Sequence, residues 1–269
     1  MIPKIIHYCW FGRNHLPESA QKCINSWKKY LPDYEIKEWN EDNFDVNSIP
    51  YTKQAYEARK YAFVSDYARF WILYNHGGLY FDTDVELIKP LDDILLKGSF
   101  MGCEKMTKLQ VEFSQCFCPN PGLGMGCEAG NNLLKELLLK YENMLFIGKS
   151  GIMNQKTIVA YTKEALVKRG LGMHKGIQFV GGFYIYPDDF FCPLGLDGKL
   201  VVTHNTRSIH HYMASWSDSN QWDNKKDKIK NYIIERVLPK TFVIAVLRYK
   251  EEKRKKLFNE MFLIKNDNT

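Results

Sequence analysis

The chain has 269 residues, of which 45% are hydrophobic and 14% are aromatic, and its formal net charge is +6. This length and apolar content are sufficient for one large globular domain, and they exclude a fibrous chain or a disordered tail. The seven cysteines are irregularly spaced, which fits a reducing compartment better than a disulfide framework. Because no basic leader precedes a long apolar run, we expect neither export nor cleavage, and a cytoplasmic location.

The first predicted elements alternate between strand and helix. Residues 4–12 (KIIHYCWFG) mix β-branched and aromatic side chains and stop at a glycine, as a buried strand with its turn does. Residues 19–34 have helical spacing with Ser19 as a candidate N-cap, and residues 34–40 (YEIKEWN) alternate like a half-buried strand. This order indicates an α/β fold in which a helix crosses over between parallel strands.

A longer helix is predicted over residues 53–75. Gly77 and Gly78 follow it at the usual place of a left-handed C-cap. Asp66 and Arg69 are three residues apart, so they occupy neighbouring positions on one face of this helix. From spacing alone, the simplest interpretation of the pair is a local ion pair.

The helix leads into a short apolar strand, residues 79–81, and then into Asp82, Thr83 and Asp84. In an extended chain residues i and i+2 point to the same side, so the two carboxylates would face one point while Thr83 faces away. Two like charges at that separation repel unless a cation joins them, and hard oxygen ligands suit Mg²⁺ or Mn²⁺. A D-x-D also occurs in ordinary surface turns, so the motif by itself leaves a metal site and a turn both open.

Four segments occur in an order that is specific when taken together. They are residues 2–12 (IPKIIHYCWFG), 26–43 (SWKKYLPDYEIKEWNEDN), 65–91 (SDYARFWILYNHGGLYFDTDVELIKPL) and 208–216 (SIHHYMASW). The set resembles glycosyltransferase family 32, which includes many bacterial capsule and polysaccharide enzymes, and more distantly the glucosyltransferase domain of the large clostridial toxins. The resemblance implies a GT-A fold: one Rossmann-like nucleotide-sugar-binding domain, with a mainly parallel sheet flanked by helices.

The resemblance also implies roles for the acidic residues. Asp84 would be the direct metal ligand, and Asp82 would contact the ribose and sugar. Asp66 and Arg69 match the S-D-x-x-R of the family, in which these side chains contact hydroxyls of the donor sugar. Asp82, Asp84 and Arg69 are therefore the residues that we expect to be catalytic.

The last segment would complete the donor site. By its spacing to Trp216, His210 matches the family's signature histidine, which reaches the metal or the pyrophosphate, and His211 is the immediate alternative. Ser215 and Trp216 would close over the diphosphate.

Two other parts of the chain are candidates for contacts with substrate. Tyr8 and Trp10, at the end of the first strand, are candidates to cover the nucleotide base by resemblance. The glycine-rich segment 116–130 is interpreted either as a loop near the donor or acceptor or as a plain connecting loop. Many family members have a Gly-Pro before the next helix, where this chain has Gly151 followed by Ile152.

The implied reaction is a metal-dependent transfer, with retention of configuration, of a hexose from a nucleotide-sugar, most commonly UDP-linked. The cofactor would be Mn²⁺ or Mg²⁺. The implied acceptor is a glycan, for example a lipid-linked oligosaccharide intermediate in capsular or surface polysaccharide synthesis. The resemblance identifies no catalytic base.

The C-terminal part of the chain is basic. Between residues 225 and 256 there are 12 Lys and Arg against 4 Asp and Glu, interleaved with apolar side chains. We therefore expect a glycosyltransferase domain over residues 1–222 and a basic amphipathic helical extension over 223–269. Residues 225–260 either bind an anionic surface on the inner face of the cell membrane or pack on the domain.

Two other classes of function remain open from the residues alone. A metal-dependent phosphohydrolase or nucleotidyltransferase also grips phosphates with a D-x-D, but it requires further clustered carboxylates or a base for water. A protein that binds nucleic acid or membrane through its basic tail, without catalysis, is the second alternative. Because the rest of the chain is slightly acidic and carries no known nucleic-acid-binding motif, we expect no nucleic-acid partner.

Overall fold

The computed structural model describes residues 1–106, 117–154, 156–173, 176–195 and 198–213. The predicted extension over 223–269, the domain boundary at residue 222, and the candidate residues Ser215 and Trp216 lie outside these ranges. No helix among the described residues is both long enough and apolar enough to cross a membrane.

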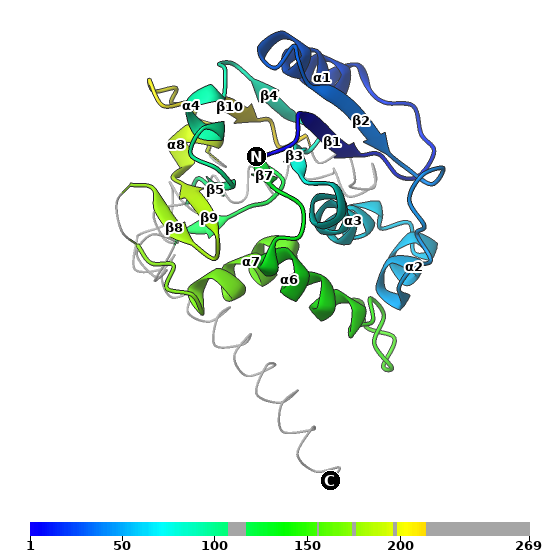
Figure 1. The fold of residues 1–269 in the computed structure, drawn as a ribbon. Coiled ribbons are helices and arrows are strands. Elements are labelled where there is room, and N and C mark those ends of the chain that lie inside the picture. The colour runs from blue at the N-terminus through cyan, green and yellow to red at the C-terminus, as the bar shows by residue number, and fades with distance from the viewer. Residues whose placement is uncertain (107–116, 155, 174–175, 196–197, 214–269) are drawn as a thin grey trace, which may run out of the picture. The chain divides into compact units, whose positions relative to one another are not determined.

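A mixed β-sheet forms the centre of the described structure, with the strand order β2-β1-β3-β7-β5-β9-β8 and β6 paired to β5 (Figure 1). Three pairs are parallel: β1 with β2, β1 with β3, and β5 with β9. The other pairs are antiparallel: β7 with β3, β7 with β5, β6 with β5, and β8 with β9. The strands are β1 (Ile5–Cys9), β2 (Glu35–Trp39), β3 (Gly78–Tyr80), β5 (Phe100–Glu104), β6 (Cys118–Pro119), β7 (Met125–Cys127), β8 (Gln178–Val180) and β9 (Phe183–Tyr186).

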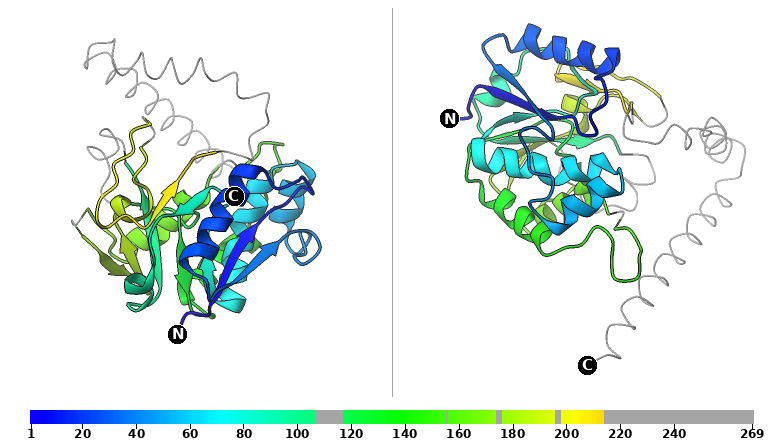
Figure 2. Two further views of the ribbon diagram at one scale, coloured as in Figure 1. Left: turned by 90° about the horizontal axis from the view of Figure 1, so that it is seen from above. Right: turned by 90° about the vertical axis from the view of Figure 1, so that its right-hand side faces the viewer.

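Helices cover both faces of this sheet, which confirms the predicted α/β class (Figures 1 and 2). One face carries α1, and the other carries α2, α3, α6 and α7. A separate pair of antiparallel strands, β4 (Val85–Leu87) and β10 (Ser208–His210), lies beside the main sheet. The helices are α1 (Glu18–Tyr30), α2 (Pro50–Glu57), α3 (Tyr61–His76), α4 (Asp92–Leu95), α6 (Asn132–Glu142), α7 (Ile158–Val167) and α8 (Asp188–Phe191).

The hydrophobic core is divided by the sheet into two clusters. One contains Trp27 of α1 with Leu79 and Phe81, around the strand that leads to the D-x-D. The other contains Phe70 of α3 and Leu134 of α6. Because α3 is packed into the second cluster along its length, the polar residues of its first turns are held rigidly at the edge of the sheet.

Two predicted helix boundaries are wrong. The helix expected over 53–75 is two helices, because Arg59 has a positive φ of 56° and the amide of Lys60 donates back to Ala55 O at 2.8 Å. Helix α1 begins at Glu18, one residue before the predicted N-cap Ser19, and Pro17 occupies the cap position without a side-chain bond. The predicted C-cap position is confirmed, since Gly77 ends the helix with a positive φ of 64° and its amide donates to Leu73 O, but its ψ of −163° differs from the left-handed helical value that was expected.

Candidate active site

The D-x-D forms a turn between two strands and is not an extended segment. Strand β3 ends at Tyr80, and the amide of Val85 donates to Asp82 O at 3.1 Å as β4 begins. The prediction that the two carboxylates approach one point is confirmed, but the turn produces it and strand alternation does not. One ligand atom from each of Asp82, Asp84 and His210 lies within 4.8 Å of the other two.

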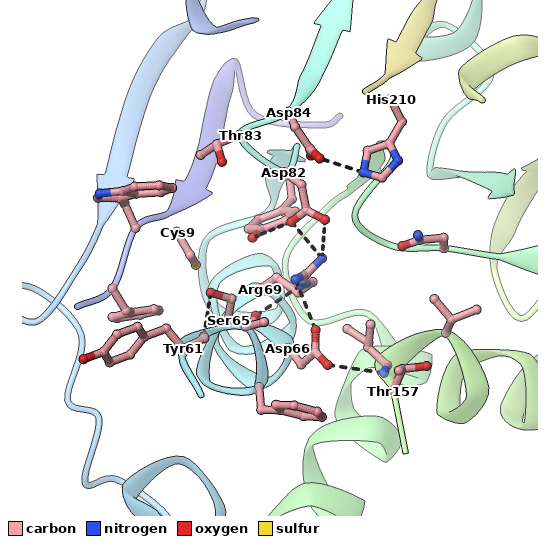
Figure 3. Close-up of a pocket in the computed structure, with 18 of the residues that line it drawn as sticks. Cys9, Tyr61, Ser65, Asp66, Arg69, Asp82, Thr83, Asp84, Thr157 and His210 are labelled. Carbon is pink, nitrogen blue, oxygen red and sulfur yellow. Dashed lines mark hydrogen bonds and ion pairs between the residues drawn. The ribbon is translucent and has the colours of Figure 1, made fainter. Parts of the chain in front are cut away.

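His210 reaches this point because β10 pairs antiparallel with β4, which places His210 opposite Val85, next to the D-x-D. Its Nε2 lies 3.1 Å from Asp84 Oδ1 (Figure 3), and the amide of Met213 donates to Asp84 Oδ2 at 3.0 Å. Burial would raise the pKa of Asp84, but the hydrogen bond and charge of His210 and the Met213 amide outweigh it and lower this pKa. Burial lowers the pKa of His210, but the hydrogen bond and charge of Asp84 prevail and raise it.

His211 is not part of the cluster of Asp82, Asp84 and His210. The structure thus corrects the expectation that His211 is an alternative metal ligand to His210. The Nε2 of His211 lies 2.8 Å from Glu86 Oε2 on the outer side of the strand pair. His210 is its neighbour at the end of β10, and successive side chains of a strand point to opposite faces. The register with β4 thus selects His210.

Arg69 joins the two acidic groups on the other side of the pocket (Figure 3). Its Nη2 lies 3.2 Å from Asp66 Oδ1 and its Nη1 lies 3.1 Å from Asp82 Oδ1. The guanidinium is stacked over the ring of Tyr80, and only 5% of its side chain is exposed. The ion pair expected from helix spacing is present, and it is also part of the pocket.

Asp66 is connected to a helix that is distant in the chain. Its Oδ2 accepts the amide of Ile158 at 3.3 Å, at the first residue of α7, so that a carboxylate from α3 satisfies one N-terminal donor of α7. Burial raises the pKa of Asp66 to about 6, against the opposing charge of Arg69.

The glycine-rich segment 116–130 contributes directly to the pocket through its described residues. The amide of Asp82 donates to Gly122 O at 2.9 Å. A Cβ on Gly122 would stand 1.9 Å from Asp82 Oδ2, so this position has no room for a side chain unless the carboxylate moves. Asn120 fixes the loop by accepting the Gly122 amide at 2.7 Å and donating to Glu104 Oε1 at 2.8 Å.

These side chains line one cavity of about 330 Å³, a size that falls in the usual range for small-molecule sites. Trp10 is in its wall, as predicted, and its Nε1 donates to Asn14 O at 2.7 Å. Tyr8 is not in the described wall: it packs against Trp27, and its hydroxyl donates to Glu38 at 2.6 Å. The structure therefore corrects the prediction that Tyr8 covers a base in this cavity, because its side chain points to the face of β1 that packs on Trp27, whereas the next residue, Cys9, points to the cavity.

Several wall residues were not predicted from the sequence. Glu104 ends β5, and a search for polar residues at the carboxyl ends of strands would have found it. Nothing local in the sequence indicates the others, because they are brought in by packing; they are Tyr61, Asn120, Thr157 and Tyr212. The ring of Tyr212 packs edge-on against His210 at 4.3 Å between centroids and limits how that imidazole can turn.

Comparison with known proteins agrees with this geometry. Residues 17–101, which include Asp66, Arg69 and the D-x-D, match the family model described as "Glycosyltransferase sugar-binding region containing DXD motif". Inositol phosphoceramide mannosyltransferase 1 of Schizosaccharomyces pombe is 30% identical over 116 residues, which cover 37% of this chain and 33% of that protein. The uncharacterized glycosyltransferase L373 of Acanthamoeba polyphaga mimivirus is 35% identical over 112 residues, covering 39% and 45%. The matches thus span a third to under a half of these curated relatives.

Solved structures show a partial likeness. The PaToxG glycosyltransferase aligns with a TM-score of 0.46 at 19% identity, over 62% of this chain and 69% of that one. The galactosyltransferase LgtC, solved with donor and acceptor sugar analogues, aligns with a TM-score of 0.37 at 14% identity, over 69% and 74%. Residues 17–101 of this chain therefore resemble a glycosyltransferase sugar-binding region of the DXD type, and this match covers less than half of the chain.

Proposed function

We propose that the protein is a metal-dependent glycosyltransferase that transfers a hexose from a nucleotide-sugar to an acceptor hydroxyl. The observation that carries the proposal is the convergence of Asp82, Asp84 and His210 within 4.8 Å, in the cavity that also holds Arg69 and Asp66. The family match over these residues supports it.

The three side chains fit a divalent cation. Two carboxylates and one imidazole are ligands that Mn²⁺ accepts, and Mg²⁺ would be held by the carboxylates. A cation bound there would stabilise, as a Lewis acid, the negative charge that develops on the leaving diphosphate. Against the effect of burial, the hydrogen bonds from His210 and the Met213 amide lower the pKa of Asp84 and so favour its ionised form, which is the form that binds a cation.

The Arg69 side of the cavity would orient the donor. Arg69 is charged at all accessible pH values, and its contacts with Asp66 and Asp82 hold both carboxylates in fixed positions. Fixed carboxylates accept hydrogen bonds from sugar hydroxyls at defined angles, and this holds the anomeric carbon near the metal ligands. Trp10 offers an aromatic face for a base at the same cavity.

The finer parts of the proposal concern substrate and place. We propose a UDP-linked hexose as donor, retention of configuration, and a glycan or lipid-linked oligosaccharide of a surface polysaccharide as acceptor. Some relatives are named mannosyltransferases, which supports including mannose donors in any search. We propose a cytoplasmic location, and we propose that residues 225–260 dock to the inner face of the membrane.

A donor screen tests the proposal. The full chain is mixed with UDP- and GDP-linked hexoses in the presence of Mn²⁺, Mg²⁺ or a chelator, and nucleoside diphosphate release and thermal stability are measured. We expect one donor to stabilise the protein and to be turned over only when a divalent cation is present. If no donor binds or reacts with either metal, the proposal is wrong. Release of inorganic phosphate or nucleoside monophosphate would favour the phosphohydrolase alternative. If the chain binds DNA and no donor, the alternative of a nucleic-acid-binding protein would be favoured.

A further inference from the structure

We propose that Glu104 is the catalytic base that takes the proton from the acceptor hydroxyl as the sugar is transferred. This inference rests on the proposed function and assigns a role that the metal ligands and the Arg69 group leave unfilled. Glu104 is the last residue of β5, and its half-buried side chain lines the cavity.

Glu104 differs from the other carboxylates of the cavity in its charge environment. Four carboxylates lie in the wall, and three of them have a cationic partner: Asp66 and Asp82 share Arg69, and Asp84 has His210. Glu104 forms no ion pair with any residue that the structure describes. A carboxylate that is not committed to a cation is available to accept a proton from a substrate.

The position of Glu104 is fixed by neutral hydrogen bonds. Its Oε1 accepts the side-chain amide of Asn120 at 2.8 Å. Because Asn120 Oδ1 already accepts the amide of Gly122, the orientation of the Asn120 amide is determined, and its Nδ2 must face Glu104. With one oxygen held in this way, Oε2 of Glu104 is left for the cavity.

The environment also makes Glu104 more basic than an ordinary carboxylate. Burial raises its pKa, while the Asn120 hydrogen bond and the nearby charge of His210 oppose this. Glu104 lines the same cavity as Asp84 and His210, where the diphosphate would leave. A base at this place would stand beside the bond that breaks.

The step balances without any further reactant. The acceptor O–H bond breaks, and its proton goes to Oε2 of Glu104. The electron pair left on the acceptor oxygen forms the new bond to the anomeric carbon, on the face from which the diphosphate leaves, so that the configuration is retained. The bond from that carbon to the diphosphate oxygen breaks, and its electron pair leaves on the nucleoside diphosphate. Water serves as the acceptor in hydrolysis, so the same base acts when no glycan is supplied.

The first test uses Glu104→Gln, since its amide oxygen can still accept from Asn120 and so preserves the wall. With the donor that wild-type protein turns over best, we expect release of nucleoside diphosphate to water to fall about 100-fold. Binding of the nucleoside diphosphate with Mn²⁺, measured by calorimetry, is expected to stay within twofold of wild type. The matched control is Asp188→Asn, a carboxylate whose pKa is also raised by burial but which is outside the described cavity wall.

The second test is chemical rescue in Glu104→Ala. Azide is a nucleophile that has no proton to lose, so it does not require a base. We expect added azide to restore turnover at least tenfold in this variant, with glycosyl azide as product, and to leave wild type nearly unchanged. A residue that only supports the wall would not be rescued in this way.

Each other outcome contradicts the inference in a recognisable manner. Wild-type hydrolysis by Glu104→Gln would show that no base acts at this position. A slow Glu104→Ala that azide leaves slow, or a Glu104→Gln that no longer binds nucleotide, would assign Glu104 a structural role in the wall. If wild type itself turns over no donor, the proposed function fails, and this inference fails with it.

Discussion

Two buried polar clusters lie beside the same pair of strands, β1 and β3, and they differ in chemistry. In the cavity, His210 has Asp84 as its partner and a raised pKa. Under β1, His7 accepts from Trp39 Nε1 at 3.0 Å and contacts Gly77 O at 2.9 Å, so both ring nitrogens have neutral partners. Burial lowers the pKa of His7 to about 4.

The comparison teaches how a structural histidine differs from a candidate ligand. His7 is 1% exposed and satisfied as a neutral ring, so it stabilises the fold and has nothing left to bind. In the cavity, Nδ1 of His210 has no hydrogen-bond partner among the described residues, and its Nε2 lies 3.1 Å from Asp84 Oδ1. Variants of the cavity cluster should therefore change activity first, and variants of the His7 cluster should change stability first.

The largest expected effect is that of Asp84→Ala. Because Asp84 is a proposed metal ligand next to the leaving diphosphate, we expect nucleoside diphosphate release to fall about 1,000-fold. Turnover of the donor with saturating Mn²⁺ measures this. The matched control is Glu86→Ala, two residues later on β4 and bonded to His211 outside the cavity, which should retain wild-type turnover. Equal losses in the two variants would show that the site is not at the D-x-D.

Arg69→Met should lower both activity and stability. It therefore tests whether a residue of the cavity cluster can also stabilise the fold, as the His7 cluster does. The change leaves the buried Asp66 and the partly exposed Asp82 near each other without their shared cation, which we expect to reduce the free energy of unfolding by about 3 kcal/mol. Denaturant unfolding measures this. Arg207→Met is the control, since its partner Asp93 is 61% exposed and the loss should be below about 1 kcal/mol.

The His7 cluster should make stability depend on pH. The folded pKa of about 4 lies below the ordinary 6.5, so the unfolded chain binds the extra proton between these values and stability falls as pH decreases through that window. We expect His7 to account for about 2 kcal/mol of the loss in unfolding free energy between pH 7 and pH 5. In His7→Gln this part should disappear. His76→Gln, an exposed ring nearby, should retain most of it, and the reverse result would contradict the assignment.

Gly122→Ala should give the smallest effect and the most local one. The added methyl group must displace the Asp82 carboxylate, since a Cβ at position 122 would stand 1.9 Å from Asp82 Oδ2. We expect turnover to fall about tenfold, because small displacements of positioned groups reduce rate strongly. Gly148→Ala is the control, with its nearest neighbour at 3.6 Å. Turnover of the same donor is measured for both variants. Unchanged turnover in Gly122→Ala would show that the position of Asp82 does not matter for the reaction.

Much of the fold and part of the site could be predicted from local pattern. The first strand and helix, the strand at Glu35–Trp39 and the C-cap at Gly77 depend on periodicity and on glycine, which are encoded in neighbouring residues. The pair Asp66 and Arg69 was visible because helix spacing alone brings them together. The break near Arg59 was not visible, because a left-handed arginine is selected by packing and has no sequence signal.

The sequence by itself determined which chemical groups the site contains: a D-x-D, an arginine three residues after an aspartate, and a histidine pair near the end of the domain. Only the tertiary structure decided which of them meet. The register of β10 on β4 selected His210 over His211, and the hydrogen bond from the Asp82 amide to Gly122 O brought Asn120 and Glu104 into the same cavity wall as Asp82. The physical reason is that these contacts join residues up to 126 positions apart in the chain, and side-chain packing, which local periodicity does not encode, determines them.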